Sequence, residues 1–182
     1  MKKCALLILT PLLLWGCGKD DEIKTYQVAP TPQETVQKTE APQTMDLPFQ
    51  ATLPKGWVQK PSSGIRVISY KIEKSALDFY LVVLYSGDLV PNVNLWRKQL
   101  HLPSLTPAEI KTLAKPVTID GVKAQSITLY NEKLNAGIFS TIIKRGPKSF
   151  WFFTAKGLAS DLKKELPQIQ AFLQSVRFKP AP

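Results

Sequence analysis

The sequence is poor in the side chains that most often carry catalysis or bind metals. Its 182 residues include two cysteines and one histidine, His101. Zinc sites normally combine several cysteine and histidine ligands, so these numbers exclude a zinc centre of the usual kind. The patterns of a serine nucleophile elbow, a phosphate-binding glycine loop and a metalloprotease helix are missing too. We therefore predict no catalytic residue, no metal site and no cofactor, and we interpret His101 as a capping or surface residue near a helix end.

Long apolar runs are also lacking, apart from one near the amino terminus. Residues 4–15 are mostly apolar, yet a membrane-spanning helix needs ~20 such residues. Lys2 and Lys3 precede the run, and Gly16-Cys17 follows it. A basic start, a short apolar core and a small residue at the end are typical of an export signal. We predict that residues 1–16 form a signal peptide that is removed.

The end of this segment resembles the lipobox of bacterial lipoproteins. Leu14, Gly16 and Cys17 match its usual pattern. The resemblance implies a diacylglycerol on the Cys17 sulfur, cleavage before that residue, and a fatty acyl chain such as palmitate on the new amino end. Because Gly18 rather than aspartate comes next, it also implies the periplasmic side of the outer membrane if the cell has two membranes. The alternative is an ordinary secretory signal with an incidental cysteine.

Negative charge is scarce relative to positive charge. The chain has 24 lysines and arginines against 14 aspartates and glutamates, a formal net charge of +10. The basic residues are dispersed and no nucleic-acid-binding motif is evident, so we predict no nucleic-acid partner. Anionic lipid head groups or cell-wall polymers suit an exported chain of this charge better. A solvated surface without a specific partner is the simpler alternative.

The chain divides into a polar segment and a segment rich in apolar residues. Residues 18–46 are rich in proline, glutamine and threonine, and such a composition cannot bury enough apolar surface to fold. We predict that residues 17–46 form a lipidated cysteine and a disordered tether, and that residues 47–179 form a single globular domain. Cys17 is the one cysteine left after the signal is removed, so this domain must fold without a disulfide.

Alternating and doubly apolar segments predict an antiparallel sheet. Ile68, Tyr70 and Ile72 share one face of a strand, and residues 78–85 are apolar on both faces, as in a central strand. Asp120-Gly121 suits a hairpin turn. The expected strands are 49–53, 66–72, 78–85, 117–119, 122–130, 137–144, 149–156 and 176–178.

The first expected helix covers residues 91–100. Val93, Trp96 and Leu100 fall on one face at helical spacing. Asn92 is the N-cap that the sequence predicts, because asparagine commonly accepts a hydrogen bond from the first helical turn.

Two further helical regions are expected. Thr106 and Glu109 have the spacing of a capping box, which predicts a short helix. A helix over 159–165 follows the last long strand. Pro167 is expected to interrupt that helix and to begin a second helical piece, since proline lacks the donor that a helix interior requires.

These elements predict an α+β fold, an antiparallel sheet of about six to seven strands flanked by helices on both sides. Residues 53–57, the hairpin at 66–85 and the closing segment 172–178 resemble the PsbP-like sandwich fold. The segment 92–103, with Asn-Val-Asn-Leu-Trp-Arg-Lys-Gln-Leu followed by Leu-Pro, is similar to one in uncharacterised bacterial proteins. The resemblance covers residues 47–179 and implies a non-enzymatic binding or accessory module.

The most distinctive polar pattern lies on the helix expected at 91–100. Arg97 could bind an anion there, and the neighbouring amides could give directional hydrogen bonds. The alternative is that the asparagines cap the helix and Arg97 bridges to the sheet or to a loop. The candidate partner-binding residues are Asn92, Asn94, Trp96, Arg97 and Gln99.

A second candidate surface is the tip of the hairpin expected near residues 144–148. Lys144, Arg145 and Lys148 could meet an anionic lipid or polymer there. The alternative is a solvated turn without a partner.

These features together predict a membrane-anchored lipoprotein of the cell envelope. We expect a non-enzymatic binding or accessory module for a protein partner or an anionic surface. One alternative is an envelope hydrolase in which Asp78, Asp88 or Glu109 are brought together by folding, and two facing carboxyls would favour it. Others are a small-ligand-binding lipoprotein, which a concave pocket with convergent polar groups would favour, and an envelope spacer.

Overall fold

The computed structural model describes residues 47–179, so the predicted signal peptide, Cys17 and the tether lie outside the described residues. No helix within this range is long and apolar enough to cross a membrane. The strands are β1 (Phe49–Gln50), β2 (Trp57–Lys60), β3 (Arg66–Ile72), β4 (Asp78–Leu84), β5 (Lys115–Ile119), β6 (Val122–Asn131), β7 (Ala136–Gly146), β8 (Ser149–Leu158) and β9 (Arg177–Phe178). The helices are α1 (Leu89–Gln99), α2 (Pro107–Leu113), α3 (Ala159–Ser175) and the short 3-10 turn η1 (Glu132–Leu134).

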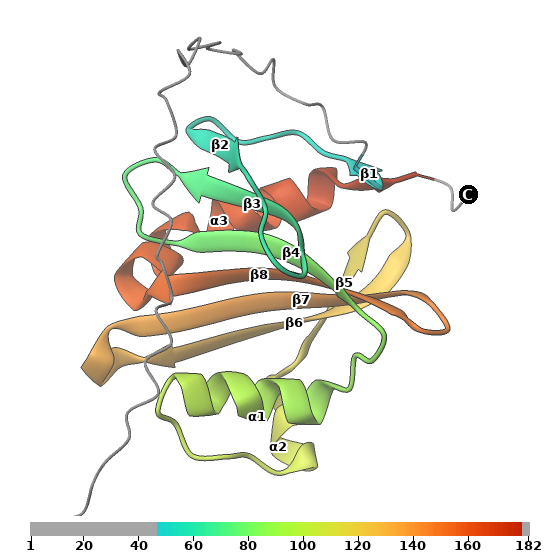
Figure 1. Ribbon diagram of the computed structural model, residues 1–182. Helices are drawn as coiled ribbons and strands as arrows, with labels where there is room; N and C mark the ends of the chain where they lie inside the picture. The colour runs from blue at the N-terminus through green and yellow to red at the C-terminus, as the bar shows by residue number, and fades with distance from the viewer. Residues whose placement is uncertain (1–46, 180–182) are drawn as a thin grey trace, which may run out of the picture. The chain divides into compact units, whose positions relative to one another are not determined.

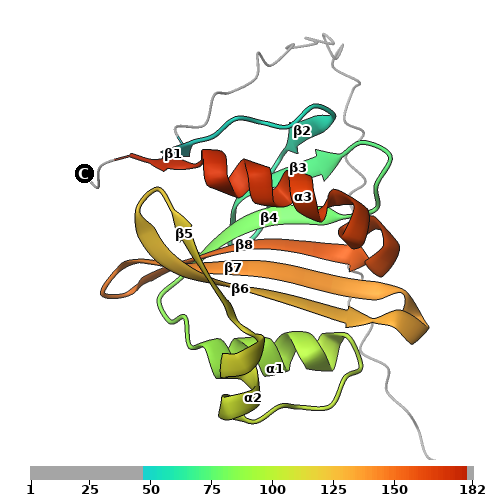
Figure 2. The ribbon, with the colours of Figure 1, turned by 180° about the vertical axis from the view of Figure 1, so that it is seen from behind.

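Seven strands form one sheet, in the order β2-β3-β4-β8-β7-β6-β5, and every neighbouring pair is antiparallel. Strands β1 and β9 pair separately and join the two ends of the described chain. Figures 1 and 2 show α3 on one face of the large sheet and α1 with α2 beside β6 on the other side. The predicted fold class, an antiparallel sheet flanked by helices on both sides, is confirmed.

Two local signals in the sequence form the structures they predict. Asp120 and Gly121 both have positive φ angles, 48° and 76°, in the tight turn between β5 and β6. At the start of α2 the Thr106 hydroxyl accepts a hydrogen bond from the Glu109 backbone, and the Glu109 carboxylate accepts one from the Thr106 backbone. These bonds satisfy donors that the helix itself leaves unpaired.

The α3 face of the sheet is an aromatic core to which all seven strands contribute. Phe172 of α3 lies at its centre and is 1% exposed. Its ring meets five others at centroid distances of 5.4 to 6.5 Å, four of them edge-on, a geometry that aromatic pairs prefer, and one stacked. These five are Phe49, Trp57, Tyr70, Phe79 and Phe153.

The opposite face carries a smaller core beneath α1 and α2. Trp96 packs against Phe152 at a centroid distance of 6.3 Å, and Val93 and Ile110 are completely buried. The buried sheet residues of this core all come from β6, β7 and β8, namely Ile127, Leu129, Ile138, Ile142 and Phe152. The same face of β2, β3 and β4 therefore contributes none of the buried residues of this second core.

Three details differ from the sequence-based expectations. α3 runs without interruption through Pro167, because apolar residues on both sides of it, Leu162 and Ile169, are buried against the sheet. Asn92 is not the N-cap of α1, since the helix begins at Leu89 and Asn92 lies inside it. Strand β2 was not expected, because its exposed residues break the apolar pattern.

Candidate functional site

The candidate site is the face of β2, β3 and β4, with Lys156 of the adjoining strand β8, that points away from α3, and we call it the open face. Strand register aligns its side chains, because residues paired across antiparallel strands point to the same side. Lys60 pairs with Ser69, Ser69 pairs with Tyr80, and Lys71 pairs with Asp78. Figure 1 views this face, and Figure 2 shows α3 covering the other.

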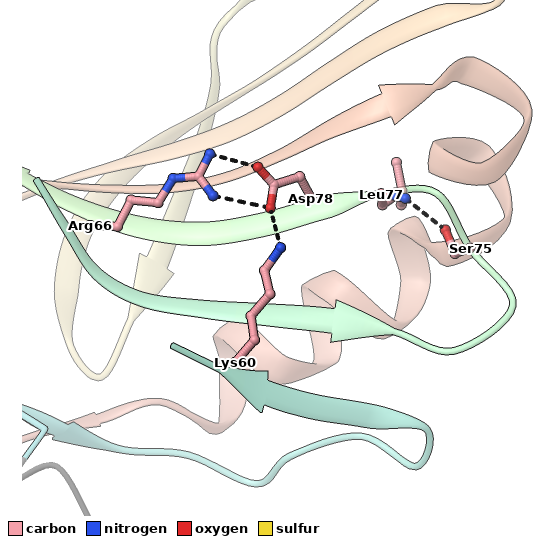
Figure 3. Close-up of polar contacts among 5 residues, drawn as sticks. All are labelled: Lys60, Arg66, Ser75, Leu77 and Asp78. Atoms are coloured by element: carbon pink, nitrogen blue, oxygen red, sulfur yellow. Dashed lines mark hydrogen bonds and ion pairs between the residues drawn. The ribbon is translucent and has the colours of Figure 1, made fainter. Parts of the chain in front are cut away.

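A carboxylate held by two basic side chains lies on the open face (Figure 3). The two guanidinium nitrogens of Arg66 donate to the two carboxylate oxygens of Asp78 at 3.1 and 2.6 Å. The Lys60 ammonium donates to Asp78 Oδ1 at 3.0 Å. These two parallel hydrogen bonds fix the orientation of the guanidinium relative to the carboxylate, and they also neutralise the charge of both groups. The three residues come from the three strands β2, β3 and β4, so the contact also ties this end of the sheet together.

The guanidinium of Arg66 lies over an aromatic ring. Its central carbon is 4.0 Å from the centroid of Tyr80, which is close enough for a cation–π contact. Burial alone would raise the pKa of Asp78, but the hydrogen bonds and positive charges of Arg66 and Lys60 outweigh it and lower that pKa. Burial raises the pKa of Tyr80. Asp78 is thus an anion and Tyr80 a neutral phenol near pH 7.

Two further lysines flank this carboxylate along the same row. Lys71 of β3 and Lys156 of β8 are both paired in register with Asp78, and both are exposed. The ammonium of Lys156 donates to Gln99 Oε1 at 2.9 Å, which joins the end of α1 to the border of the open face. Across β2, β3, β4 and β8 this face carries four basic side chains and one carboxylate. The open face therefore has a surplus of positive charge.

The turn before Asp78 is held by α3. The Asp161 carboxylate accepts hydrogen bonds from the Ala76 backbone at 2.7 Å and from the Ser75 hydroxyl at 3.2 Å. The Ser75 oxygen in turn accepts one from the backbone of Leu77 at 3.2 Å (Figure 3). These bonds fix the chain one residue before β4 begins, so Asp78 is positioned by the folded core.

The polar residues expected on α1 separate into two groups. The Asn94 amide donates to the Leu105 carbonyl and accepts from its backbone N–H, and Arg97 Nε donates to the Pro103 carbonyl at 2.6 Å. Both therefore fasten the connection between α1 and α2, as the alternative interpretation of Arg97 expected. Gln99 alone contacts the border of the open face.

The other two members of this predicted set have local contacts. Asn92 donates to the carbonyl of Asp88 one turn earlier, within its own helix. Trp96 is 8% exposed and belongs to the core under α1. The folded chain does not gather the five residues into one polar surface.

The basic residues expected at the hairpin tip also diverge. Successive residues of a strand point to opposite faces. The guanidinium of Arg145 lies 3.9 Å from the ring centroid of Phe178 on the α3 side, whereas the ammonium of Lys144 lies 5.8 Å from the ring centroid of Phe150 on the other. Lys148 is exposed in the turn. The three charges therefore do not form one basic patch.

The three carboxylates considered for hydrolysis lie in three different local environments. Asp78 is paired with Arg66 and Lys60, and the Glu109 carboxylate is engaged by Thr106. Asp88 occupies the N-cap position of α1 without a capping hydrogen bond from its side chain. Within residues 47–179, no three potential metal-ligating side chains gather.

Sequence reasoning missed the main residues of the open face. Lys60 lies in a strand that was not expected, and Arg66 and Asp78 are twelve residues apart at the starts of two strands. The sequence did contain one signal of the open face, the polar face of the strand expected at 66–72, which includes Lys71. The pairing of that face with Asp78 follows from the register between β3 and β4.

No family model matches the chain, and no curated protein sequence is significantly similar to it. Two solved structures have similar folds. CyanoP, the cyanobacterial PsbP of Synechocystis sp. PCC 6803, matches with a TM-score of 0.47 and 8% identity over 72% of this chain and 87% of CyanoP. A protein of Bacteroides thetaiotaomicron VPI-5482 matches with a TM-score of 0.44 and 7% identity over 73% of this chain, which spans 46% of that protein's length. A PsbP protein is thus among the structural neighbours, and similarity at this level says nothing of what the chain binds.

Proposed function

We propose that this protein is a lipid-anchored, non-enzymatic binding module of the cell envelope that contacts an anionic partner through its open face. The observation that carries the proposal is the surplus of basic side chains on the open face, where, within residues 47–179, strands β2, β3 and β4 contribute no buried residue to the core under α1 and α2. Lys71 and Lys156 flank Asp78 there, and neither forms an ion pair within residues 47–179. An acidic partner would neutralise them without displacing the contact between Arg66 and Asp78.

The anchor part of the proposal rests on the amino-terminal sequence. The lipobox-like ending at Cys17 implies attachment to a membrane, with the periplasmic side of the outer membrane favoured where two membranes exist. Two or more acyl chains on one residue bind stably, whereas one chain binds marginally. The folded domain would then present its open face to partners near the membrane surface.

Binding of two polyanions to the full-length protein tests the open face. Polyglutamate represents an acidic protein, and polyphosphate represents an anionic polymer. The double variant Lys71→Glu/Lys156→Glu is expected to bind the preferred polyanion at least about tenfold more weakly at low salt, because exposed charges attract strongly there. Stronger binding of polyglutamate would identify a protein partner, and stronger binding of polyphosphate a polymer.

The matched control is Lys111→Glu on α2, where an exposed lysine away from the open face reverses its charge in the same way. It should reduce affinity only slightly. The single variants Lys71→Glu and Lys156→Glu complete the comparison. If Lys111→Glu lost as much affinity for the polyanion as each of them, net charge alone would drive binding and the open face would have no specific role.

Intact-mass spectrometry and fractionation test the anchor. The natural protein should carry the mass of acyl chains on a chain that begins at Cys17, and it should sediment with membranes. Cys17→Ala should move it out of the membrane fraction. An unclipped amino end of unmodified mass would contradict this part of the proposal and leave the open face untouched.

A further inference from the structure

A depression of about 350 Å³ lies at the other end of the sheet, separate from the open face. Ligand pockets usually measure roughly 300–1,000 Å³, so this volume suits a small molecule. Its floor is apolar and its rim is basic and polar. The lining residues are Gly87, Lys123, Ala124, Gln125, Ile142, Lys144 and Phe150.

Two lysines from neighbouring strands line this depression. Ala124 of β6 pairs with Ile143 of β7, so the adjacent residues Lys123 and Lys144 lie side by side. Like charges placed opposite each other on a sheet repel. The ammonium of Lys144 also lies 5.8 Å from the ring centroid of Phe150, directly above the apolar floor.

No carboxylate within residues 47–179 forms an ion pair with either lysine. The lining contains no aspartate or glutamate, and Asp88, which follows Gly87 in the chain, does not belong to it. Neither ammonium group is therefore neutralised by an ion pair within the described residues, and an anion placed between them would supply the missing counter-charge.

The walls of the depression restrict the rest of the ligand. Ile142 is 7% exposed and, with the ring of Phe150, supplies the apolar side chains of the lining. Gly87 packs so close to Phe150 that a Cβ atom there would lie 2.0 Å from a ring carbon. This wall therefore requires glycine, and it keeps Phe150 as the floor of the depression. Gln125 adds an amide at the rim.

We propose that this depression binds a small organic anion, whose charged group lies between Lys123 and Lys144 and whose flat apolar part lies on Phe150 and Ile142. The inference goes beyond the proposed function, because the residues and the size of the ligand differ from those of the open face.

Calorimetric titration of the full-length protein with phenyl phosphate tests the site, with inorganic phosphate and benzyl alcohol as the two partial ligands. Phenyl phosphate should bind at least about tenfold more tightly than either, since only it uses both the lysines and the apolar floor. Lys123→Gln and Lys144→Gln should each weaken it by about fivefold. The matched control Lys148→Gln, in the nearby turn but outside the lining, should leave it unchanged.

Three outcomes would overturn the assignment. Equal affinities for phenyl phosphate and inorganic phosphate would reduce it to unspecific anion attraction. If Lys148→Gln lost as much affinity for phenyl phosphate as Lys144→Gln, binding would again be unspecific anion attraction. Binding to phosphatidylglycerol vesicles that depends on Lys123 and Lys144, with no heat from phenyl phosphate, would assign these lysines to a lipid surface instead. Each result is independent of Lys71 and Lys156, so it leaves the open face to its own test.

Discussion

The two faces of the large sheet are built on different principles. The α3 face buries apolar side chains from all seven strands, and the aromatic rings among them come from β2, β3, β4, β7 and β8. On the other face, the buried sheet residues of the second core come from only three strands, β6, β7 and β8, and the open face beside them carries paired and unpaired charges. Apolar burial supplies most of the stability of a domain that has no disulfide among its described residues. The α3 face can therefore hold the fold while the opposite face is available for binding.

The largest expected effect comes from the centre of the aromatic core. Phe172→Ala should lower the free energy of unfolding by about 4 kcal/mol, because it leaves a cavity among five rings. Trp96→Ala, on the other face, should cost about 3 kcal/mol, since its ring meets one aromatic neighbour. Chemical denaturation measures both, and Phe172→Leu should lose less than about 1.5 kcal/mol. If Trp96→Ala lost more free energy of unfolding than Phe172→Ala, the α1 side of the sheet would contribute more to stability than the α3 side.

The second expected effect is a gain in stability from replacing the proline inside α3. Pro167 lies inside α3 and cannot donate a hydrogen bond to the preceding turn. Pro167→Ala should raise the free energy of unfolding by about 2 kcal/mol, because alanine restores that bond and favours the helix. Gln168→Ala, at the next exposed position, is the control and should change it by less than about 0.5 kcal/mol. An unchanged or lowered stability in Pro167→Ala would mean that the helix depends on the bend or packing that proline provides.

The third effect separates structure from recognition on α1. Asn94→Ala should lower the free energy of unfolding by about 1.5 kcal/mol, since it leaves both backbone groups of Leu105 without their partner. Asn92→Ala, which loses one exposed bond within the helix, should cost less. Neither should alter binding of polyanions. Weaker binding by a stably folded Asn94→Ala protein would return this side of α1 to the binding surface.

The smallest effect concerns the paired charges of the open face. Asp78→Asn should cost about 1 kcal/mol at pH 7, because Arg66 and Lys60 lose a partly exposed counter-ion. The pKa of Asp78 is lowered in the folded state, so its contribution is complete above the ordinary value of 3.8 and is lost as the pH falls through the lowered pKa. The difference between wild type and variant should therefore vanish in acid.

Unfolding free energies measured from pH 7 down to pH 2 test this prediction. Glu132→Gln is the matched control, because it breaks the more exposed ion pair with Lys163 and should cost less than about 0.5 kcal/mol. A difference for Asp78→Asn that is as large at pH 2 as at pH 7 would show that the lost hydrogen-bond geometry matters more than the charge.

Local signals were reliable where they concerned one turn or one strand. The capping box at Thr106 and the turn at Asp120-Gly121 depend on neighbouring backbone groups, so their sequence is sufficient. Pro167 was misjudged because propensity describes an isolated helix, whereas α3 packs across the sheet on both sides of that residue. The contact of Arg66 with Asp78 could not be predicted, since it depends on the register between two strands.

By itself the sequence determined which segments are apolar on one face or on both, and hence that an antiparallel sheet would lie between helices. Tertiary structure decided which charged side chains contact one another. Side chains from β2, β3, β4 and β8 share the open face because the strand order brings β8 beside β4, across more than sixty residues of chain. Periodicity sets the side of a strand to which a residue points, but only pairing between strands sets its neighbours.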